Sequence, residues 1–573
     1  MIAVTTSVVR LLAPERTLKQ GVALHQAGQL REALLIYDRI LSVDANNFVA
    51  NHLKGVIFYQ QKKYLKAIPF IRRAIEINSQ IPDAYSNLGL VLNALTHHEE
   101  ALANFDTAIS LRADYAQAHN NRAIALVELA RPQEAIASYQ KAISLQPNNS
   151  VTFFNLGKAQ QDGFLPEEAL ESYGSAISLN PHYVEALNNR GNVLKGLGRI
   201  EEAISHFQRA VAIKPDYVSA YVNWGNGLLS FNRLADAIAT YGKAIAITSD
   251  NADAYLGQAV ALLLQGDYES GLRIYEWRWH HKGLKQYQRN FERTLWLGVE
   301  PLSGRTILLH AEQGLGDTIQ FCRYVQLLID LGARVVLEVQ GSLLGLMRSL
   351  PSEAVLISKG DALPAFDYHC PLLSLPLALK TTITSIPNSQ AYLRADARAL
   401  SRWNGVLGEK KFLRVGLAWS GNPTHSNDRT RSIALADLMA HLPAGLEYVC
   451  LQKDIRSTDL AMLQSSSCIR YFGDAIRDFS DTAALCELMD VVVSVDTSIA
   501  HLGGAMGRPT WIMLPYHPDW RWLLERDDSP WYPSVSLYRQ PALFDWSSVL
   551  AKVRVELEKL AEEPSTIARL REN

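Results

Sequence analysis

The chain has 573 residues, enough for about three or four domain-sized units with a hydrophobic core in each. Its formal net charge at pH 7 is -2, so the composition gives no reason to expect sequence-independent binding to nucleic acid or to an anionic membrane. The five cysteines form no C-x-x-C pair, which argues against a disulfide framework and against a cysteine-ligated zinc site.

The beginning of the chain has no charged leader before its apolar residues, and no run approaches the ~18 apolar residues of a membrane span. The cysteine pattern suits a reducing compartment. We therefore expect a cytoplasmic protein without a transmembrane segment, and peripheral attachment to a membrane stays open.

The first half of the chain repeats with a period of 34 residues. One column consists of Ala33, Ala67, Ala101, Ala135, Ala169, Ala203 and Ala237, with Gly271 completing the series. A second column of small residues, which lets paired helices approach closely, consists of Gly21, Gly55, Gly89, Ala123, Gly157, Gly191, Gly225 and Ala259. Pro147, Pro181 and Pro215 follow the second helix of their units, where a missing N–H stops propagation.

In period and column pattern, residues 14–283 resemble the tetratricopeptide repeat, in about eight copies. A single helix pair of this kind cannot bury its apolar face, so the pairs must stack. The resemblance implies an α superhelix with a long concave groove, of the kind that mostly binds proteins or peptides.

An asparagine column with the same period lies two residues before the small-residue column. It consists of Asn87, Asn121, Asn155, Asn189 and Asn223. An amide side chain both donates and accepts hydrogen bonds, which matches an extended peptide backbone of any sequence. The column resembles that of the O-linked N-acetylglucosamine transferases, whose repeats hold acceptor polypeptides. The alternative is that these asparagines only bond neighbouring repeats.

The period fails after the last repeat, at an aromatic and basic stretch from Tyr275 to Lys282. We interpret this stretch as a cap that docks the array on the next domain, in preference to a ligand-binding element. Residues 284–300 are then a capping or linker segment.

From Arg305 onward short apolar strands alternate with helices. The first round has strands at 306–311, 334–339 and 354–358, and the second has strands at 412–419, 446–451, 469–472, 491–495 and 510–514. Such βαβ alternation predicts parallel sheets with ligands at the carboxyl ends of their strands. We expect two Rossmann-like halves, 301–400 and 405–555, that face a cleft as in the glycosyltransferase-B architecture, followed by a C-terminal tail at 556–573.

The stretch from Val491 to Pro515 reads as a buried strand, a tight turn and a helix. Asp496, Thr497 and Ser498 occupy the turn. The unpaired amides and the positive dipole end of a helix N-terminus attract anions, so the turn predicts a site for a phosphate or diphosphate.

A glycine-rich turn, GLGDTIQ at 314–320, follows the first strand. It lacks the third glycine of the dinucleotide fingerprint. With Gly314, Gly316 and Asp317 it resembles the heptosyltransferase-like family, glycosyltransferase family 9, in which this aspartate is the proposed general base. The resemblance implies that Asp317 takes a proton from the acceptor; the alternative is an N-cap for the following helix.

Four segments of this chain resemble further motifs of that family: 416–432, 451–453, 481–509 and 519–534. Carried over to this sequence, the resemblance implies donor contacts from the glycine-rich turn (Gly314, Gly316) and from Ser420, Asn422, Gln452, Lys453, Asp496, Thr497, Ser498 and His501. Arg429 and Arg431 supply positive charge for a departing diphosphate. The same arginines are also compatible with a solvated surface, and His501 with a hydrogen bond inside the core.

No Asp-x-Asp pair is present, so the usual metal anchor of the other large glycosyltransferase architecture is missing. We expect a metal-independent, inverting glycosyltransferase that has no cofactor and uses a nucleotide-diphosphate sugar as co-substrate, with a polypeptide acceptor in the repeat groove. Two alternatives stay open: an acceptor that is a glycan or is lipid-linked, and a protein-binding scaffold that has lost activity.

Overall fold

A computed structural model describes residues 5–312, 314–388, 391–424 and 427–562 of the chain. Its residues fall into two compact units, 1–220 and 221–573. Three predicted segments, the glycine-rich turn, the motif 416–432 and the C-terminal tail, each contain or adjoin positions outside the described residues.

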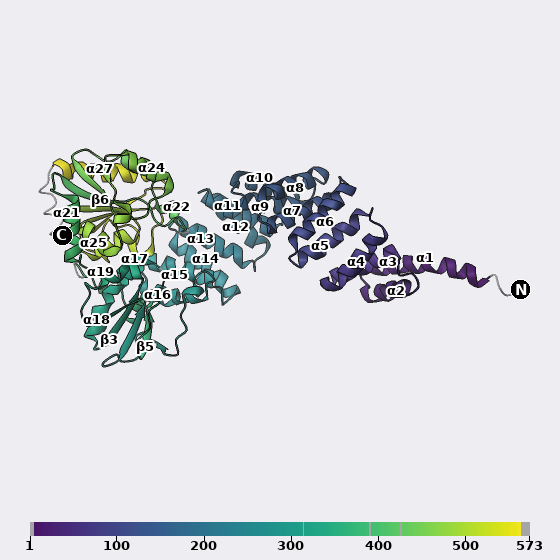
Figure 1. Ribbon diagram of the computed structural model, residues 1–573, viewed down its shortest axis with the longest axis horizontal. Helices are drawn as coiled ribbons and strands as arrows, with labels where there is room; N and C mark the ends of the chain where they lie inside the picture. Colours follow the sequence, from purple (N-terminus) through teal and green to yellow (C-terminus); the bar gives the residue numbers. More distant parts are fainter. Residues whose placement is uncertain (1–4, 313, 389–390, 425–426, 563–573) are drawn as a thin grey trace. The chain divides into compact units, whose positions relative to one another are not determined.

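The first unit is a stack of helix pairs (Figure 1). Its helices are α1 (Thr5–Gln26), α2 (Leu30–Val43), α3 (Phe48–Gln60), α4 (Tyr64–Ile77), α5 (Pro82–Ala94), α6 (His98–Leu111), α7 (Ala116–Glu128), α8 (Pro132–Leu145), α9 (Ser150–Asp162), α10 (Pro166–Leu179), α11 (Val184–Gly196) and α12 (Ile200–Ile213).

The repeated columns explain this packing. Each alanine of the first column from Ala33 to Ala203 has no exposed surface. Each glycine of the second column lies against a large side chain of the next helix: a Cβ on Gly89 would stand 2.6 Å from the Phe105 ring, and one on Gly191 2.5 Å from Phe207. The small residues are therefore required for the close approach of paired helices.

The second unit begins with the last helix pairs of the array. These are α13 (Val218–Ser230), which crosses the boundary between the units, α14 (Leu234–Ile247), α15 (Ala252–Gln265) and α16 (Tyr268–Tyr275), followed by the 3-10 helix η1 (Glu276–His280). The sequence predicts one array over residues 14–283. In the structure, the last helices of this array belong to the same compact unit as the α/β region. One reason is Asn232, whose amide donates to the Tyr516 carbonyl over 2.8 Å.

The α/β region contains two sheets whose strands are all parallel, as predicted. The first has the order β1-β5-β2-β3-β4, with β1 (Thr294–Leu295), β2 (Thr306–His310), β3 (Arg334–Val339), β4 (Val355–Ser358) and β5 (Tyr368–Pro371). The second has the order β11-β10-β9-β6-β7-β8, with β6 (Leu413–Ala418), β7 (Leu446–Cys450), β8 (Ile469–Arg470), β9 (Val491–Val495), β10 (Thr510–Leu514) and β11 (Val535–Arg539).

Short helices connect these strands. Those of the first sheet are α17 (Leu315–Phe321), α18 (Val325–Asp330), α19 (Gly341–Met347), η4 (Leu372–Ser374) and α20 (Leu375–Ala378). Those of the second sheet are α21 (Ala397–Leu407), α22 (Asp428–Arg431), α23 (Leu435–Met439), α24 (Ser457–Ser465), α25 (Phe479–Glu487), α26 (Ser498–Ala505), η7 (Trp520–Trp522) and α27 (Trp546–Glu562).

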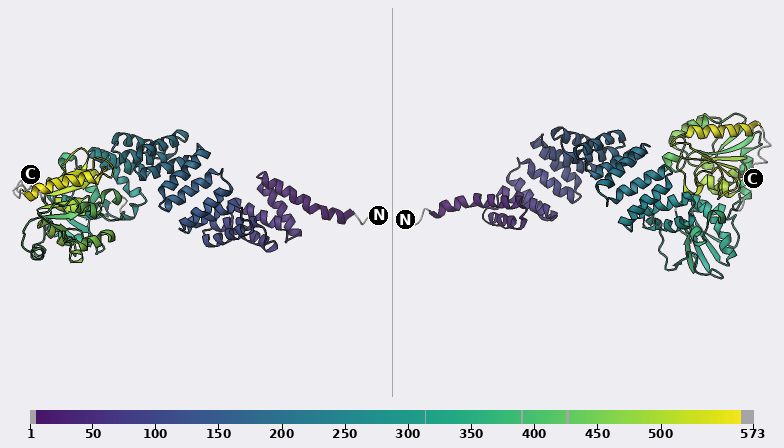
Figure 2. Two further views of the ribbon diagram at one scale, coloured as in Figure 1. Left: turned by 90° about the horizontal axis from the view of Figure 1, so that it is seen from above. Right: turned by 180° about the vertical axis from the view of Figure 1, so that it is seen from behind.

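The second sheet has its main core beneath α27. This helix lies along one face of the sheet (Figure 2), where Val549, Val553 and Leu557 pack on strand residues such as Val493 and Met513. Residues 556–562 of the expected C-terminal tail thus belong to a helix. Among the described residues, no helix combines the length and apolar composition that crossing a membrane requires.

Candidate functional site

Two strand-to-helix turns, one from each sheet, face each other in the second unit. The first joins β2 to α17 and the second joins β9 to α26, and both strands are central in their sheets. The helices pack closely at their N-termini: a Cβ on Gly316 would stand 2.8 Å from Cδ2 of His501 and 3.6 Å from Cα of Ser498. Gly316 is therefore a point of contact between the two halves, and Gly314 is the N-cap of α17.

Asp317 lies in the first turn of α17 and is paired with a cation of the other half. Its Oδ1 accepts a hydrogen bond from Nη2 of Arg521 over 2.6 Å. Burial raises the pKa of Asp317, while Arg521 acts in the opposite direction. The carboxylate is held toward the C-terminal half and also accepts the backbone amide of Gly314, the N-cap residue of its own helix.

Arg521 is the centre of this contact. It lies in η7 with 7% of its side chain exposed. Besides Asp317 it binds Asp519, with Nη1 2.9 Å from Oδ1, and its Nε donates to Gln320 over 2.5 Å. One buried guanidinium thus bridges the α17 helix and the segment before η7.

The turn between β9 and α26 is an N-terminal cap. The Thr497 hydroxyl accepts the amide of Ile499 over 3.3 Å, as a capping residue does. His501, one turn further, pairs its Nδ1 with the Tyr532 hydroxyl at 2.9 Å, and its ring stacks on Trp522 with 5.3 Å between centroids. Burial lowers the pKa of His501 to about 3, so the imidazole is neutral at pH 7.

Asp496 directly follows strand β9 and has a carboxyl group with a shifted pKa. Burial and the nearby Asp519 carboxylate raise the pKa of Asp496 to about 6, against the opposing charges of Arg431 and Arg521. The Arg431 guanidinium donates to the Asp496 carbonyl over 3.1 Å. The structure therefore brings Asp317, Asp496, Ser498, His501 and Arg431 into one region.

The predicted donor loop of the second half is partly assembled. Gln452 accepts the amides of Trp419 and Ser420 over 2.7 and 3.2 Å and donates to the Ser420 hydroxyl over 3.0 Å. Three other predicted residues, Asn422, Arg429 and Lys453, are exposed. The Asn422 side chain accepts the Thr424 amide and so stabilises a local turn. Lys453 donates a long hydrogen bond of 3.4 Å to the Arg477 carbonyl.

The strand order locates a crevice between these loops. In the second sheet β6, β7 and β8 run to one side and β9, β10 and β11 to the other, so the order reverses between β6 and β9. Open α/β sheets bind ligands outside the carboxyl ends of their strands at such a reversal. Ser420 follows β6 and Asp496 follows β9, so both flank this crevice.

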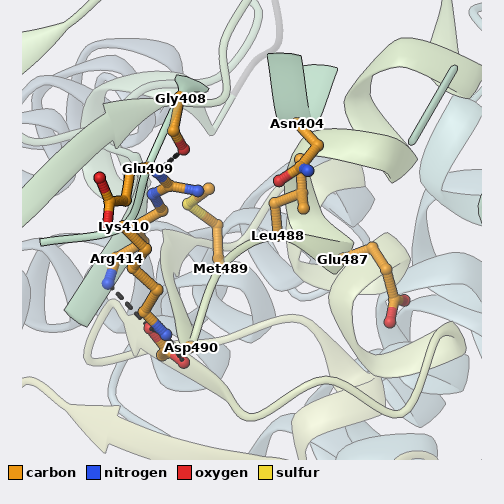
Figure 3. A pocket seen from close by; sticks show the side chains of 9 residues that line it. All are labelled: Asn404, Gly408, Glu409, Lys410, Arg414, Glu487, Leu488, Met489 and Asp490. Atoms are coloured by element: carbon orange, nitrogen blue, oxygen red, sulfur yellow. Dashed lines mark hydrogen bonds and ion pairs between the residues drawn. The ribbon is translucent and has the colours of Figure 1, made fainter. Parts of the chain in front are cut away.

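A separate cavity of about 430 Å³ lies at the amino ends of strands β6 and β9 of the second sheet (Figure 3). Lys410 pairs with Asp490 at 2.6 Å, and Arg414 also lines the cavity. Lys410 precedes β6, Arg414 is the second residue of β6, and Asp490 directly precedes β9. Because parallel sheets bind ligands at their carboxyl ends, we assign no donor site to this cavity.

The asparagine column lies half-buried on the first helix of successive repeats. In the first unit, Asn87 bonds His52 at 2.8 Å, Asn121 accepts from Asn120 at 3.4 Å, and Asn189 accepts from Asn188 at 3.3 Å. Asn155 occupies the same position on α9. The Asn87 contact joins neighbouring repeats, whereas the other two are long bonds within one helix.

In the second unit, Asn223 lines a cavity of about 350 Å³ between α13 and α15. Asn226, Asp253 and His281 contribute further polar groups, with Leu256 and Val260 as apolar lining. The Oδ1 of Asn226 accepts the Tyr241 hydroxyl over 2.6 Å, which directs its N–H groups elsewhere.

Two buried arginines, Arg278 and Arg521, were not among the site residues predicted from the sequence. Arg521 lies within the segment 519–534, whose tryptophans are compatible with stacking on a sugar or a base and equally with packing between the two halves; Trp520, Trp522 and Trp531 are buried in the structure. Arg278 lies within the aromatic cap and is paired with Glu312, the second residue after β2. The available signal was an arginine flanked by tryptophans in both places. No group of three or more His, Cys, Asp or Glu side chains among the described residues is arranged to hold a metal ion.

Comparison with known proteins identifies the repeats. The tetratricopeptide repeat family model matches residues 116–149 and 184–217, a TPR repeat model matches 225–266, and the model of anaphase-promoting complex, cyclosome, subunit 3 matches 26–108. The N-terminal half is therefore built of tetratricopeptide repeats, whose stacked helix pairs are suited to protein or peptide partners.

Among curated proteins, the chain is similar to Protein FlbA of Caulobacter vibrioides, with 25% identity over 330 residues, 53% of this chain and 54% of FlbA. The chain thus spans about half the length of this relative. One similar solved structure is YrrB, a TPR protein with an unusual peptide-binding site; it has 28% identity and a TM-score of 0.30, and the match covers 32% of this chain and 95% of YrrB. Another is MamA, with 22% identity and a TM-score of 0.27, and the match covers 28% of this chain and 94% of MamA.

Proposed function

We propose that this chain is a glycosyltransferase that moves a sugar from a nucleotide-diphosphate sugar to a polypeptide recruited by the repeats, with inversion and without a metal ion. The observation that carries the proposal is the opposition of the β2–α17 and β9–α26 turns, with Asp317 on one and Asp496 to Ser498 on the other. In this proposal the two parallel sheets are the halves of a glycosyltransferase-B fold.

The donor diphosphate is placed at the N-terminus of α26. The amides after Thr497 and the helix dipole supply partial positive charge there, and Arg431 lies beside Asp496. The crevice between β6 and β9 receives the rest of the nucleotide, next to Ser420 and Gln452, with Lys453 at its edge. These groups take the place of a cation when the diphosphate leaves.

Asp317 is the general base. Its carboxylate accepts the proton of the acceptor hydroxyl as the oxygen attacks the anomeric carbon and the diphosphate departs from the opposite face. The raised pKa of Asp317 favours this role, because a base is most effective when its pKa approaches the working pH. Arg521, which is itself held by Asp519, orients the carboxylate.

The acceptor is proposed to be a polypeptide because the repeats display amides at a fixed spacing. Asn87, Asn121, Asn155, Asn189 and Asn223 would bond the backbone of an extended chain irrespective of its sequence. The bonds that Asn121 and Asn189 accept within their own helices are long, at 3.4 and 3.3 Å, and are therefore weak. In the alternative with a glycan or lipid-linked acceptor, the repeats are only a docking arm.

The test is sugar transfer in vitro. The full-length protein is incubated with ADP, UDP, GDP and dTDP sugars and a proteome extract, and labelled protein is quantified. Asp317→Asn should lower transfer about 10²-fold or more while nucleotide-induced thermal stabilisation is kept. Asp330→Asn, at the end of α18, is the matched control. Full transfer by Asp317→Asn would show that the base assignment is wrong.

The acceptor class is tested by replacing the five asparagines of the column with alanine. Protein labelling should collapse if the column holds the acceptor, whereas transfer to a glycan should survive. Asn78 and Asn180, which are exposed residues at helix C-termini outside the column, serve as control positions for the same substitution.

An inactive protein-binding scaffold is the second candidate. The observation that favours it is the ion pair of Asp317 with Arg521, which occupies the proposed base. A scaffold predicts that none of the four nucleotide diphosphates raises the melting temperature, because a ligand that binds only the folded state must stabilise it.

A further inference from the structure

Arg278 follows the last repeat in sequence, yet its side chain ends among the loops of the first sheet. It lies in η1 with 2% of the side chain exposed. Nε and Nη2 each donate to one carboxylate oxygen of Glu312 over 3.0 Å, and Nη2 also donates to the Ser374 hydroxyl over 2.7 Å. Such a two-point contact fixes the orientation of the carboxylate as well as its distance.

The position of this contact in the sheet is informative. In the first sheet β2, β3 and β4 run to one side, and β5 lies on the other, so the strand order reverses between β2 and β5. Glu312 follows β2 and Ser374 follows β5. Arg278 therefore fills the crevice in which such a sheet would otherwise bind a ligand, while the corresponding crevice of the second sheet is assigned to the donor.

The segment that carries Arg278 is itself anchored to the array. Trp277 stacks on Tyr255 of α15, with 3.9 Å between ring centroids and 12° between planes. His281 approaches Asp253 of the same helix at 3.1 Å. Glu276 accepts from Nη1 of Arg278 over 2.5 Å and from Ser374 over 2.8 Å, so the cap is tied at both ends.

We infer that Arg278 is a positioning residue for Asp317: it fixes Glu312 just after β2, two residues before the N-cap of α17, and so makes the cap of the repeat array part of the catalytic unit. This inference rests on the proposed function, in which Asp317 is the base. Arg278 does not touch the reacting atoms. It acts on the turn from the side of the repeats, whereas Arg521 acts on Asp317 from the side of the second sheet.

The charges around Asp317 provide a readout that a purely structural role would not change. Arg521 and Arg278 lower the pKa of Asp317 against burial, and Asp519 raises it. Tyr275 and Glu312 interact electrostatically with Asp317 as well. Removing the positive charge at 278 should therefore move the acidic limb of the transfer rate to higher pH, while a lysine at 278 should leave that limb in place.

The experiment compares full-length variants Arg278→Met, Arg278→Lys and Arg278→Met with Glu312→Leu. The matched control is Arg414→Met, because Arg414 is also a buried arginine paired with a glutamate, Glu447 at 2.9 Å, but lies at the amino end of β6, beside the cavity of Figure 3. Each variant is assayed for kcat, donor KM and pH profile, and for hydrogen exchange of the α17 amides, residues 315–321.

For Arg278→Met we expect kcat to fall about 10²-fold, while the donor KM stays within about twofold of its original value. A misplaced catalytic group lowers kcat in this way without weakening donor binding. The α17 amides should exchange about tenfold faster than in Arg414→Met. Arg278→Lys should lose kcat without a shift of the acidic limb. The double variant should recover thermal stability, since an apolar pair can replace a buried ion pair, but should not recover kcat.

Unchanged exchange of α17 in Arg278→Met would overturn the inference, and so would a wild-type kcat in the double variant. Failure of the proposed function is a separate result, because it requires that the unaltered protein transfers no sugar. In that case the exchange measurement still decides whether Arg278 holds the turn.

Discussion

Arg521 and Asp317 form an ion pair between the two halves of the α/β region, with 2.6 Å between Nη2 and Oδ1. The same guanidinium binds Asp519 at 2.9 Å, so one buried cation neutralises two carboxylates. Asp496 lies close enough to Asp519 for the latter to raise its pKa. The charge balance of three carboxyl groups thus depends on Arg521.

Replacement of Arg521 by glutamine should therefore destabilise the second unit. Breaking a buried pair by removing one partner costs about 3–5 kcal/mol, because the remaining charge stays buried. We expect the free energy of unfolding to fall by that amount at pH 7.5 and to recover partly at pH 5, where the carboxyl groups take up protons. Urea unfolding at both pH values measures the effect.

The double variant Arg521→Gln with Asp519→Asn is the internal control, since it removes one of the uncompensated charges. It should be more stable than the single variant at pH 7.5. Equal stability of the two variants would contradict the view that Arg521 balances these carboxylates.

The strands of the α/β region were predictable where they are continuous apolar runs. Val491 to Val495 is wholly buried, as a central parallel strand must be, and its hydrophobicity reveals it. The strands β1, β5 and β11 were missed. β1 has two residues, β5 contains a histidine and a proline, and β11 is a half-buried edge strand, so pairing with a neighbour, and not composition, makes them strands.

The acidic residues of the site were predictable for a local reason. Asp317 and Asp496 each follow a buried strand at the start of a helix, and this pattern is contained in a few consecutive residues. The arginines were not predictable in this way. Arg521 contacts a residue 204 positions earlier and Arg278 contacts one 34 positions later, and no local period encodes such pairs.

Asp496 should make donor binding depend on pH. Its pKa is raised to about 6, so the carboxyl group is mostly ionised at pH 7.5 and would repel a diphosphate at the α26 N-terminus. A protonated Asp496 removes this repulsion. We therefore expect the Kd for the nucleotide sugar to decrease as the pH falls from 7.5 through about 6. Each 1.4 kcal/mol of electrostatic repulsion that protonation removes lowers the Kd by about tenfold.

Titration calorimetry with the intact nucleotide sugar measures this dependence, because its diphosphate does not titrate in this range. Asp496→Asn should bind with a Kd that hardly changes between pH 7.5 and 5.5. Asp437→Asn, an exposed carboxylate of the same half, should keep the dependence of the unaltered protein. A steep dependence that persists in Asp496→Asn would assign it to another group.

His501 should make the stability of the second unit sensitive to acid. Burial lowers its pKa to about 3 in the folded chain, below the value of about 6.5 for an unfolded histidine. Between these pH values the unfolded state binds more protons, so the free energy of unfolding decreases as the pH falls. The loss amounts to about 2–3 kcal/mol between pH 6.5 and 4.5.

His501→Gln should reduce this acid sensitivity without removing it, because His310 and His517 are also buried with lowered pKa values of about 3 and 4. Melting temperatures at pH 7.5 and 4.5 give the comparison. His182→Gln, on the exposed surface of the first unit, provides the reference. If His501→Gln and the reference lose the same stability on acidification, His501 is not a neutral buried group in the folded chain.

Gly316 should tolerate no side chain, because the first turn of α17 packs on α26 at this residue. A Cβ at this position would stand 2.8 Å from Cδ2 of His501, whose ring is fixed by Tyr532 and Trp522 and cannot move aside cheaply. We expect Gly316→Ala to lower the free energy of unfolding by about 1–3 kcal/mol, the usual cost of overpacking.

A Cβ on Gly405 in α21 would meet no atom within 4 Å, so Gly405→Ala should gain about 0.5–1 kcal/mol from helix propensity. Urea unfolding of both variants is the measurement, and a neutral or stabilising Gly316→Ala would mean that the two turns do not pack against each other in solution.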